Sequence, residues 1–212
     1  MIIAVDGPAA SGKGTIARAL ARRYGLPHLD TGLLYRAVAA NVIRLGLDPT
    51  QEADAVAACD FDDLLLADDF LRDDDVGKTA SVVSAHPLVR ASLLLRQRRF
   101  AAQPGGAVLD GRDIGTVIAP DADAKLFVKA TPQIRARRRH DELKARGSTL
   151  SFDRVLADIR ARDQRDQTRA AAPLVMAPDA GILDTSFLSI EAAVQRAADL
   201  VERQRALKAR SS

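Results

Sequence analysis

The chain has 212 residues, 47% of them hydrophobic and 28% charged, a composition typical of a soluble globular protein with room for one α/β domain. Its net charge of +3 requires no nucleic-acid or membrane partner, and the single cysteine, Cys59, excludes an intramolecular disulfide framework and a cysteine-based zinc site. The first apolar run starts at residue 2, which leaves no room for a signal peptide, and no run is long enough to span a membrane, so we expect a cytoplasmic protein.

Short apolar runs that alternate with helical patterns predict a parallel β-sheet with helices on both faces. Five strands are expected, at Ile2–Val5, His28–Leu29, Ala107–Leu109, Ala124–Val128 and Ile182–Leu183. Helices are expected at Thr15–Arg23, Leu33–Leu45, Pro87–Ala101, Pro132–Ala145, Ser151–Arg162 and Ile190–Leu207. Ligands of such sheets bind beyond the carboxyl ends of the strands, where the polar motifs of this chain fall.

A phosphate-binding loop lies between the first strand and the first helix. Residues 7–15 read Gly-Pro-Ala-Ala-Ser-Gly-Lys-Gly-Thr, which matches G-x-x-x-x-G-K in the context of a strand and a helix. Gly7 and Gly12 let the backbone N–H groups curl around an anion, and Lys13 can reach the outer phosphates. Gly14 stands where most such loops have the Ser or Thr that meets Mg²⁺, so we expect Thr15 to contact a phosphate instead. This departure points away from GTPases.

A second polar motif follows the second strand, where residues 30–36 read Asp-Thr-Gly-Leu-Leu-Tyr-Arg. Asp30 or Thr31 can cap the helix that starts here, and capping alone would account for Asp30. Arg36 lies one turn into the helix, from where its guanidinium can point at an anion held at the helix start. An isolated surface arginine is the alternative.

The third strand is followed by residues 110–116, Asp-Gly-Arg-Asp-Ile-Gly-Thr. Asp110 ends the apolar run, where a carboxylate usually holds Mg²⁺-bound water. Arg112 can bind a phosphate, and Asp113 can accept hydrogen bonds from an amine. An ordinary polar surface loop is the alternative.

The last polar cluster spans residues 162–169. If it is helical, Arg162, Asp166 and Arg169 lie on one face at i, i+4 and i+7. The alternative is a solvated helix with surface salt bridges. Pro173 and the apolar residues after it indicate a segment that folds back toward the core. A different segment, residues 59–74, alternates acidic pairs with apolar residues, and we expect it to be a short solvated insertion.

Taken in order, these motifs resemble those of the bacterial cytidylate kinases. The resemblance rests on residues 7–15 and 30–36, on Val-Arg at 89–90, and on residues 110–116 and 162–169 followed by Ala-Pro-Leu, and it runs through almost the whole chain. An adenylate kinase would carry Phe-Pro-Arg after Asp-Gly and usually a longer lid. The resemblance implies an α/β P-loop kinase fold in one domain over residues 1–212. Its expected parts are a core (1–45, 86–131 and 170–212), a short monophosphate-binding insert (46–85) and a lid (132–169).

The resemblance also implies an activity, the in-line transfer of a phosphoryl group from ATP to CMP, and to dCMP, with Mg²⁺, by a monomer. No general base is needed, because a phosphate monoester is already an anion at neutral pH. Kinases for another acceptor such as UMP, and a P-loop ATP-binding regulator without transfer, are the alternatives. The insert, which carries Ser81, is short for the family. Thr31 stands where the family more often has Ser.

The site residues implied by the resemblance fall into three overlapping groups. The expected ATP-binding residues are Gly7, Pro8, Ala9, Ala10, Ser11, Gly12, Lys13, Gly14 and Thr15. The expected CMP-binding residues are Thr31, Arg36, Ser81, Arg90, Arg112, Asp113, Arg162, Asp166 and Arg169. The expected catalytic residues are Lys13, Arg36, Arg112 and Arg162.

Overall fold

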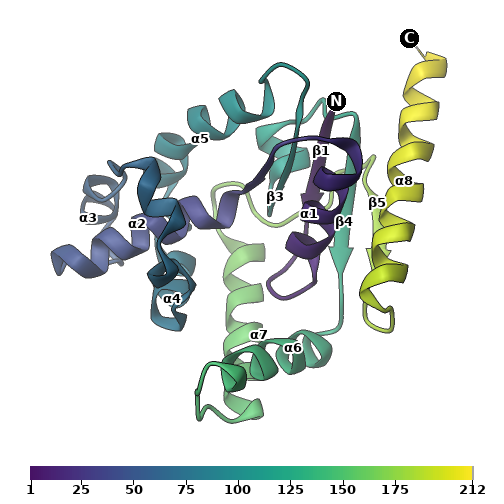
Figure 1. The fold of residues 1–212 in the computed structure, drawn as a ribbon. Coiled ribbons are helices and arrows are strands. Elements are labelled where there is room, and N and C mark those ends of the chain that lie inside the picture. The colour runs from purple at the N-terminus through teal and green to yellow at the C-terminus, as the bar shows by residue number, and fades with distance from the viewer. Residues whose placement is uncertain (212) are drawn as a thin grey trace.

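Five parallel strands form the centre of the protein, as the sequence predicts. The computed structural model (Figure 1) describes residues 1–211, and Ser212, the last residue of the predicted domain, lies outside them. The strands are β1 (Ile2–Asp6), β2 (His28–Asp30), β3 (Ala107–Gly111), β4 (Ala124–Lys129) and β5 (Gly181–Asp184). Their order across the sheet is β2-β3-β1-β4-β5. Asp6, at the carboxyl end of the central strand, therefore pairs with Gly111 on one side and Phe127 on the other.

All six predicted helices are present. They are α1 (Lys13–Tyr24), α2 (Thr31–Leu45), α5 (Pro87–Ala101), α6 (Pro132–Ala145), α7 (Phe152–Thr168) and α8 (Ile190–Ser211). The prediction is too short for α7, which continues beyond Arg162, and for α8, which continues beyond Leu207. Within residues 1–211, none of the helices is both long and apolar enough to cross a bilayer.

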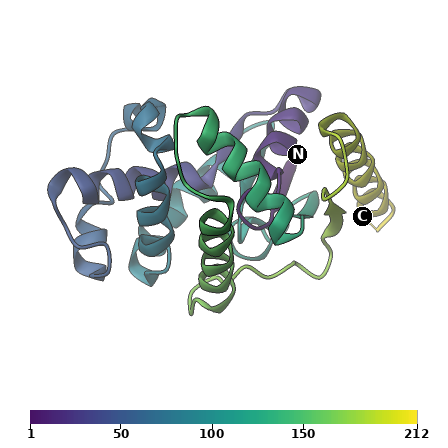
Figure 2. The same cartoon turned by 90° about the horizontal axis from the view of Figure 1, so that it is seen from below.

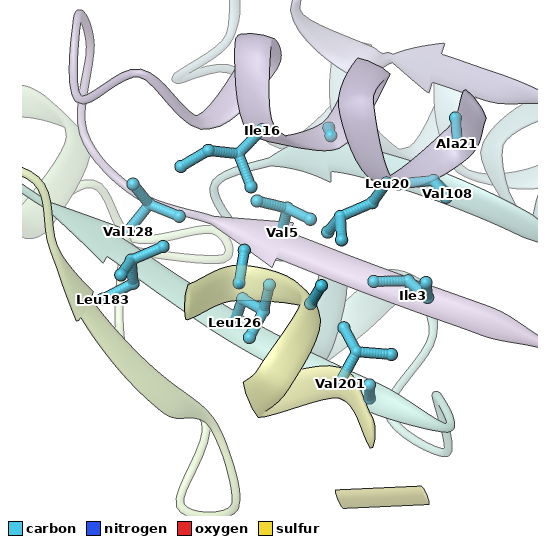
Figure 3. Close-up of a cluster of buried hydrophobic side chains, with 14 of the residues drawn as sticks. Ile3, Val5, Ile16, Leu20, Ala21, Val108, Leu126, Val128, Leu183 and Val201 are labelled. Atoms are coloured by element: carbon cyan, nitrogen blue, oxygen red, sulfur yellow. The ribbon is translucent and has the colours of Figure 1, made fainter. Parts of the chain in front are cut away.

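The two faces of the sheet are covered by different helices. Ile3 and Val5 of β1 pack against Leu20 of α1 and Val201 of α8 (Figure 3). Ala4 lies on the other face, in a cluster that includes side chains of α5. A strand buried on both faces reads as an unbroken apolar run, which is the pattern that the sequence shows at Ile2–Val5.

Residues 46–85 form a helical insert, which the sequence pattern did not resolve. Its elements are α3 (Glu52–Ala57), η1 (Asp63–Ala67), η2 (Asp69–Arg72) and α4 (Asp74–Val83). Several of its aspartates are helix caps, and each accepts the backbone N–H two residues further on: Asp62, Asp68 and Asp73. Leu71 and Val76 are fully buried against α2. Leu71 belongs to residues 59–74, so the expectation of a solvated insertion is wrong for this residue, which extends the core.

Helices α6 and α7, drawn in green in Figure 2, pack against each other, and α7 lies next to α4 of the insert. Their packing includes a buried ion pair in which Arg135 binds both oxygens of Asp163, at 2.9 and 2.6 Å. Arg135 also donates to the carbonyl oxygen of Ala9, and Ala9 packs in the same apolar cluster as Val155 and Ile159 of α7. The helix pair is thus attached to the loop that follows β1.

Candidate active site

The backbone after β1 has the form of a phosphate cradle. Gly7 has φ +154, and a Cβ there would overlap the carbonyl oxygen of Val128, so only glycine fits. Ala10 and Gly12 also have positive φ, +57 and +90. Gly12 is the N-cap of α1 and offers no side chain, so the first N–H groups of the helix stay available to an anion.

A cavity of about 580 Å³, here called the loop cavity, opens between this loop and the start of α8. Five of the nine predicted ATP-binding residues line it, namely Ala10, Gly12, Lys13, Gly14 and Thr15. Gly7, Pro8 and Ser11 line neither this cavity nor the smaller one beside it. Ser11 is fully buried, and its carbonyl oxygen accepts a hydrogen bond from Thr185.

Lys13 connects the loop cavity with a second, smaller cavity, since it lines both. Burial, reinforced by the Arg112 guanidinium, lowers the pKa of Lys13 to about 8, while Asp110 and Asp30 oppose the shift. The ammonium group therefore stays mostly charged at neutral pH, and a bound polyanion would raise its pKa again.

Two carboxyl groups at the ends of β2 and β3 face the loop cavity. Asp110 is 1% exposed, and its Oδ2 lies 2.8 Å from Nε2 of His28. Asp30 caps α2 by accepting the N–H of Gly32, and burial together with Asp110 raises its pKa. Within residues 1–211 no cluster of three or more histidine, cysteine or acidic residues could hold a metal ion. The carboxylates of Asp30 and Asp110 suit a Mg²⁺ ion that keeps its water ligands and is held through them, because Mg²⁺ gives up water reluctantly.

The smaller cavity, of about 190 Å³, is here called the arginine cavity. Eight of the nine predicted CMP-binding residues line it, together with Ala9 of the loop. The ninth, Ser81, is buried in α4 and accepts a hydrogen bond from Arg165, at 3.2 Å. It lines a neighbouring space of about 300 Å³ between α4 and α7. The structure thus brings the predicted CMP-binding residues together in one cavity, except for Ser81, which lies in the helical insert.

Asp113 lies at one end of the arginine cavity, between two arginines. Its Oδ2 is 2.5 Å from Nη2 of Arg90, and its Oδ1 is 3.8 Å from Nη2 of Arg169. The Arg90 guanidinium stacks over the Tyr35 ring, 5.3 Å from its centroid. Each arginine also donates to a backbone carbonyl, Arg90 to Ser84 and Arg169 to Ala172. These anchors hold a hydrogen-bond acceptor in a fixed position inside the cavity.

The other end of the arginine cavity carries an excess of positive charge. Arg112 donates to Asp166 at 2.7 Å, and although burial raises the pKa of Asp166, Arg112 and Arg162 hold it below its usual range. Burial and the Arg112 charge lower the pKa of Arg162 to about 9. The Nε of Arg162 is buried and has no hydrogen-bond partner in the described part of the chain. Such an unpaired donor among like charges is suited to a bound anion.

Arg36 enters the same end of the cavity from α2. Its Nη1 donates to the carbonyl oxygens of Leu71 and Asp73 in the insert, at 2.6 and 3.2 Å. Arg36 is therefore not an isolated surface arginine, which was the alternative for this residue. The Thr31 hydroxyl, also in the cavity, donates to the carbonyl oxygen of Asp110 and ties the start of α2 to β3.

The cluster of residues 162–169 is helical as far as its last member. Helix α7 ends at Thr168, and Arg169 is its C-cap, with φ −60 and its N–H on the Arg165 carbonyl oxygen, so Arg169 keeps the predicted i+7 position. Its ψ of 141 turns the chain out of the helix after this residue. Asp166 is only 3% exposed, which excludes the alternative of a solvated helix for this residue.

Two residues near the site are not among the site residues that the sequence assigns. The sequence leaves open which of Arg135, Arg137, Arg138 and Arg139 contact ATP, and Arg138 lines the loop cavity and donates to the Thr185 carbonyl at 2.6 Å. Asp6, next to Gly7, accepts hydrogen bonds from residues 114 and 115. The position of Asp6 directly before the glycine loop was the available signal, since a charged residue at the end of a buried strand needs a partner.

Comparisons with known proteins agree with these observations. The sequence profile of the family described as cytidylate kinase matches residues 3–203. The cytidylate kinase of Xanthobacter autotrophicus is 60% identical over 206 residues, which cover 97% of this chain and 99% of the relative. That of Azorhizobium caulinodans is 57% identical over 205 residues, 97% of this chain and 100% of the relative. A gluconokinase structure from Sinorhizobium meliloti 1021 shares the fold, with a TM-score of 0.56 at 15% identity over 99% of this chain and 96% of that one. The chain has the P-loop kinase fold and belongs to the cytidylate kinase family.

Proposed function

We propose that this protein transfers the terminal phosphoryl group of ATP to CMP, and to dCMP, giving CDP or dCDP and ADP. The observation that carries the proposal is the position of Asp113, a fixed acceptor in a cavity that opens toward Lys13. Cytosine offers an exocyclic amine at the place where uracil offers a carbonyl, so an acceptor there favours cytosine. Membership of the cytidylate kinase family supports the same substrate.

In this proposal ATP occupies the loop cavity, with its phosphates on residues 7–15, and CMP occupies the arginine cavity. All four predicted catalytic residues, Lys13, Arg36, Arg112 and Arg162, line the arginine cavity. They surround the place where the two nucleotides meet. A new bond forms between a CMP phosphate oxygen and the terminal phosphorus, while the bond to the bridging oxygen of ADP breaks.

The main obstacle to this reaction is repulsion between two anions. The second pKa of a phosphate monoester is about 6, so no proton must be removed at neutral pH. Lys13 and the arginines neutralise charge and align donor and acceptor in line. When Mg²⁺ is bound it neutralises the ATP phosphates further, and we propose that Asp110 holds it through water.

The insert and the α6–α7 pair are proposed to be the monophosphate-binding part and the lid. Three contacts join them: Arg139 to Asp74 at 2.9 Å, Arg146 to the Arg72 carbonyl at 3.1 Å, and Arg165 to Ser81 at 3.2 Å. Contacts of this kind can close the site and exclude water, which would otherwise hydrolyse ATP. Both cavities are lined by residues of one chain, so a single copy would suffice for the reaction, and we propose a monomer that acts on small nucleotides in the cytoplasm.

The proposed function is tested by coupled ADP release with a panel of nucleoside monophosphates. We expect CMP and dCMP to be used best and UMP to be used more slowly. A clear preference for UMP or another monophosphate would mean that this nucleotide, and not CMP, is the acceptor. Nucleotide binding without transfer to any monophosphate would favour a regulatory ATP-binding protein.

Asp166→Ala tests the place of Asp166 in the acceptor site, where the resemblance to the cytidylate kinases implies that it lies near the sugar of CMP. We expect the KM for CMP to rise about 10- to 100-fold, because hydrogen bonds to charged groups contribute about 1.5–3 kcal/mol. The rise should differ between CMP and dCMP, since dCMP lacks one hydroxyl that a carboxylate can accept. ATP affinity without CMP should hardly change, because the loop of residues 7–15 is untouched.

Steady-state kinetics with both acceptors measure this effect, and a melting curve excludes unfolding. Asp153→Ala is the matched control, since Asp153 is an exposed aspartate in the first turn of the same helix. Wild-type KM values for both acceptors in Asp166→Ala would remove Asp166 from the proposed site.

The pKa of Lys13 predicts how ATP binding depends on pH. Because the ligand-free pKa is about 8 and phosphates bind the ammonium form, ATP affinity should fall as the pH rises through 8. The dissociation constant should be about tenfold higher at pH 9 than at pH 7 if the neutral form binds poorly. The stability of the ligand-free protein depends on pH in the opposite direction. Between pH 8 and the ordinary lysine pKa the unfolded chain binds more protons than the folded protein, so the contribution of Lys13 to the free energy of unfolding rises with pH in this range.

Calorimetric titration with ATP in the absence of CMP measures this dependence. Lys13→Arg is the internal control, because a guanidinium keeps its charge over this range and should flatten the profile. An ATP affinity that is constant from pH 7 to 9 in the unmodified protein would contradict the prediction.

A further inference from the structure

The side chain of Asp6 is buried and takes no part in the phosphate or base contacts proposed above. Asp6 is 6% exposed, ends the central strand β1, and directly precedes Gly7 of the phosphate loop. Its Oδ1 accepts the backbone N–H of Ile114 and its Oδ2 accepts that of Gly115, both at 2.8 Å. Both oxygens of the carboxylate are thus used to hold the segment that follows Asp113.

That segment is a single π-helical turn, η3 (Ile114–Ile118), whose N-cap residue is Asp113. An aspartate at an N-cap ordinarily accepts a hydrogen bond from an N–H group in the first turn of its own helix. Asp113 makes no such bond. Its carboxylate turns instead to Arg90 and Arg169 in the arginine cavity. The first two N–H groups of the turn already have their acceptor in Asp6.

The geometry points to Asp6 as a positioning residue for recognition of the acceptor base: by capping the turn from β1, it leaves the Asp113 carboxylate free to face the cavity. This inference rests on the proposed function. Tight packing supports a fixed arrangement, because a Cβ at Gly115 would lie 3.1 Å from Lys125 and 3.4 Å from Asp6. Since Asp6 is joined to Gly7, one side chain connects the loop proposed for ATP with the loop proposed for the base.

Asp6→Asn tests the inference. Asparagine keeps one acceptor oxygen but presents an amide donor to the other N–H group, which is then left without an acceptor. The Asp113 carboxylate, as the N-cap side chain, is the group placed to replace it and would leave the cavity to do so. We expect the KM for CMP to rise and the ratio of kcat/KM for CMP to that for UMP to fall by about tenfold, the size of one discriminating base contact. ATP affinity without CMP should stay within about twofold, because the cradle of residues 7–15 is retained.

The double variant Asp6→Asn/Asp113→Asn distinguishes positioning from general support of the fold. If Asp6 acts through Asp113, the CMP-to-UMP ratio of the double variant should equal that of Asp113→Asn alone. The kinetics are compared at pH 8, above the pKa of about 7 that burial gives to Asp6. An Asp6→Asn protein with the unmodified ratio, and a lower melting temperature only, would overturn the inference.

Asp123→Asn is the matched control, because Asp123 accepts the N–H of Ile2 at the opposite end of β1, also at 2.8 Å. It should lower stability without changing the CMP-to-UMP ratio. The ratio of the unmodified protein is measured first. A protein that does not prefer CMP contradicts the proposed function, whereas a preference that survives in Asp6→Asn contradicts this inference alone.

Amide hydrogen exchange of the unmodified protein gives a second test that does not depend on a variant folding. The N–H groups of Ile114 and Gly115 should be protected before any nucleotide is added, since Asp6 already holds them. Fast exchange at both amides in the nucleotide-free protein would overturn the inference.

Discussion

Replacing Lys13 with alanine should reduce kcat for transfer from ATP to CMP by about 10²- to 10³-fold, the usual cost of removing a group that stabilises developing charge. The structure gives the reason, because Lys13 lines both cavities and so stands where the migrating phosphoryl group must pass. Arg112 and Arg36 are not free to take its place. Arg112 is paired with Asp166, and Arg36 is held by carbonyl oxygens of the insert.

The measurement is single-turnover transfer at saturating ATP and CMP, so that weaker binding does not mask the chemical step. Lys129→Ala is the matched control, since Lys129 is a half-exposed lysine at the end of β4 that lies 3.9 Å from Asp184 and lines neither cavity. Melting curves should be similar for both variants. Retention of more than about a tenth of the wild-type rate in Lys13→Ala would contradict the proposed role of the loop.

The glycine loop and the strand ends could be predicted because their signals are local. The apolar run at Ile2–Val5, the glycines at positions 7 and 12 and the helix that follows are contiguous in the chain, and each has a direct backbone consequence. Parallel strands then bring their carboxyl ends to one edge of the sheet. This explains why Asp30 and Asp110, far apart in sequence, line the same cavity.

The features that the sequence did not predict depend on contacts between distant segments. The short helices of the insert have too few turns for a clear period, and their burial depends on packing against α2. Ser81 is turned toward α7, where Arg165 binds it. Asp6 meets partners that lie more than 100 residues away, at positions 114 and 115. The pattern of β1 and its loop contains no information about which N–H groups will arrive there.

Arg169 could be predicted because its signal is also local. Its spacing from Asp166 matches a helix, and as the C-cap of α7, with its N–H on the Arg165 carbonyl oxygen, it keeps that position. The chain leaves the helix after Arg169, and the Leu174 N–H bonds to the Asp166 carbonyl oxygen as the segment turns back. Pro173 and the apolar residues after it predicted this return toward the core.

Asp113→Asn should reduce kcat/KM for CMP by about 10- to 100-fold and narrow the preference for CMP over UMP, since one base contact discriminates by about 1–3 kcal/mol. The cavity should keep its shape. Arg90 and Arg169 have second anchors on the carbonyl oxygens of Ser84 and Ala172, so they stay in place when the carboxylate is neutralised. Asparagine can also offer its own amide donor to a uracil carbonyl, which raises the use of UMP relative to CMP.

The test compares kcat/KM for CMP and UMP in the unmodified protein and in Asp113→Asn, with ATP affinity measured separately. We expect kcat/KM for the acceptors to change and the ATP affinity to stay the same, because Asp113 lines the arginine cavity and not the loop cavity. Equal kcat/KM for CMP and UMP in the unmodified protein would rule out this account of selectivity at once. If the unmodified protein prefers CMP and Asp113→Asn keeps the full preference, base selection must come from other polar side chains of the arginine cavity. Arg90, Arg169 and Thr31 are the first to test, since all three line this cavity and belong to the predicted CMP-binding residues.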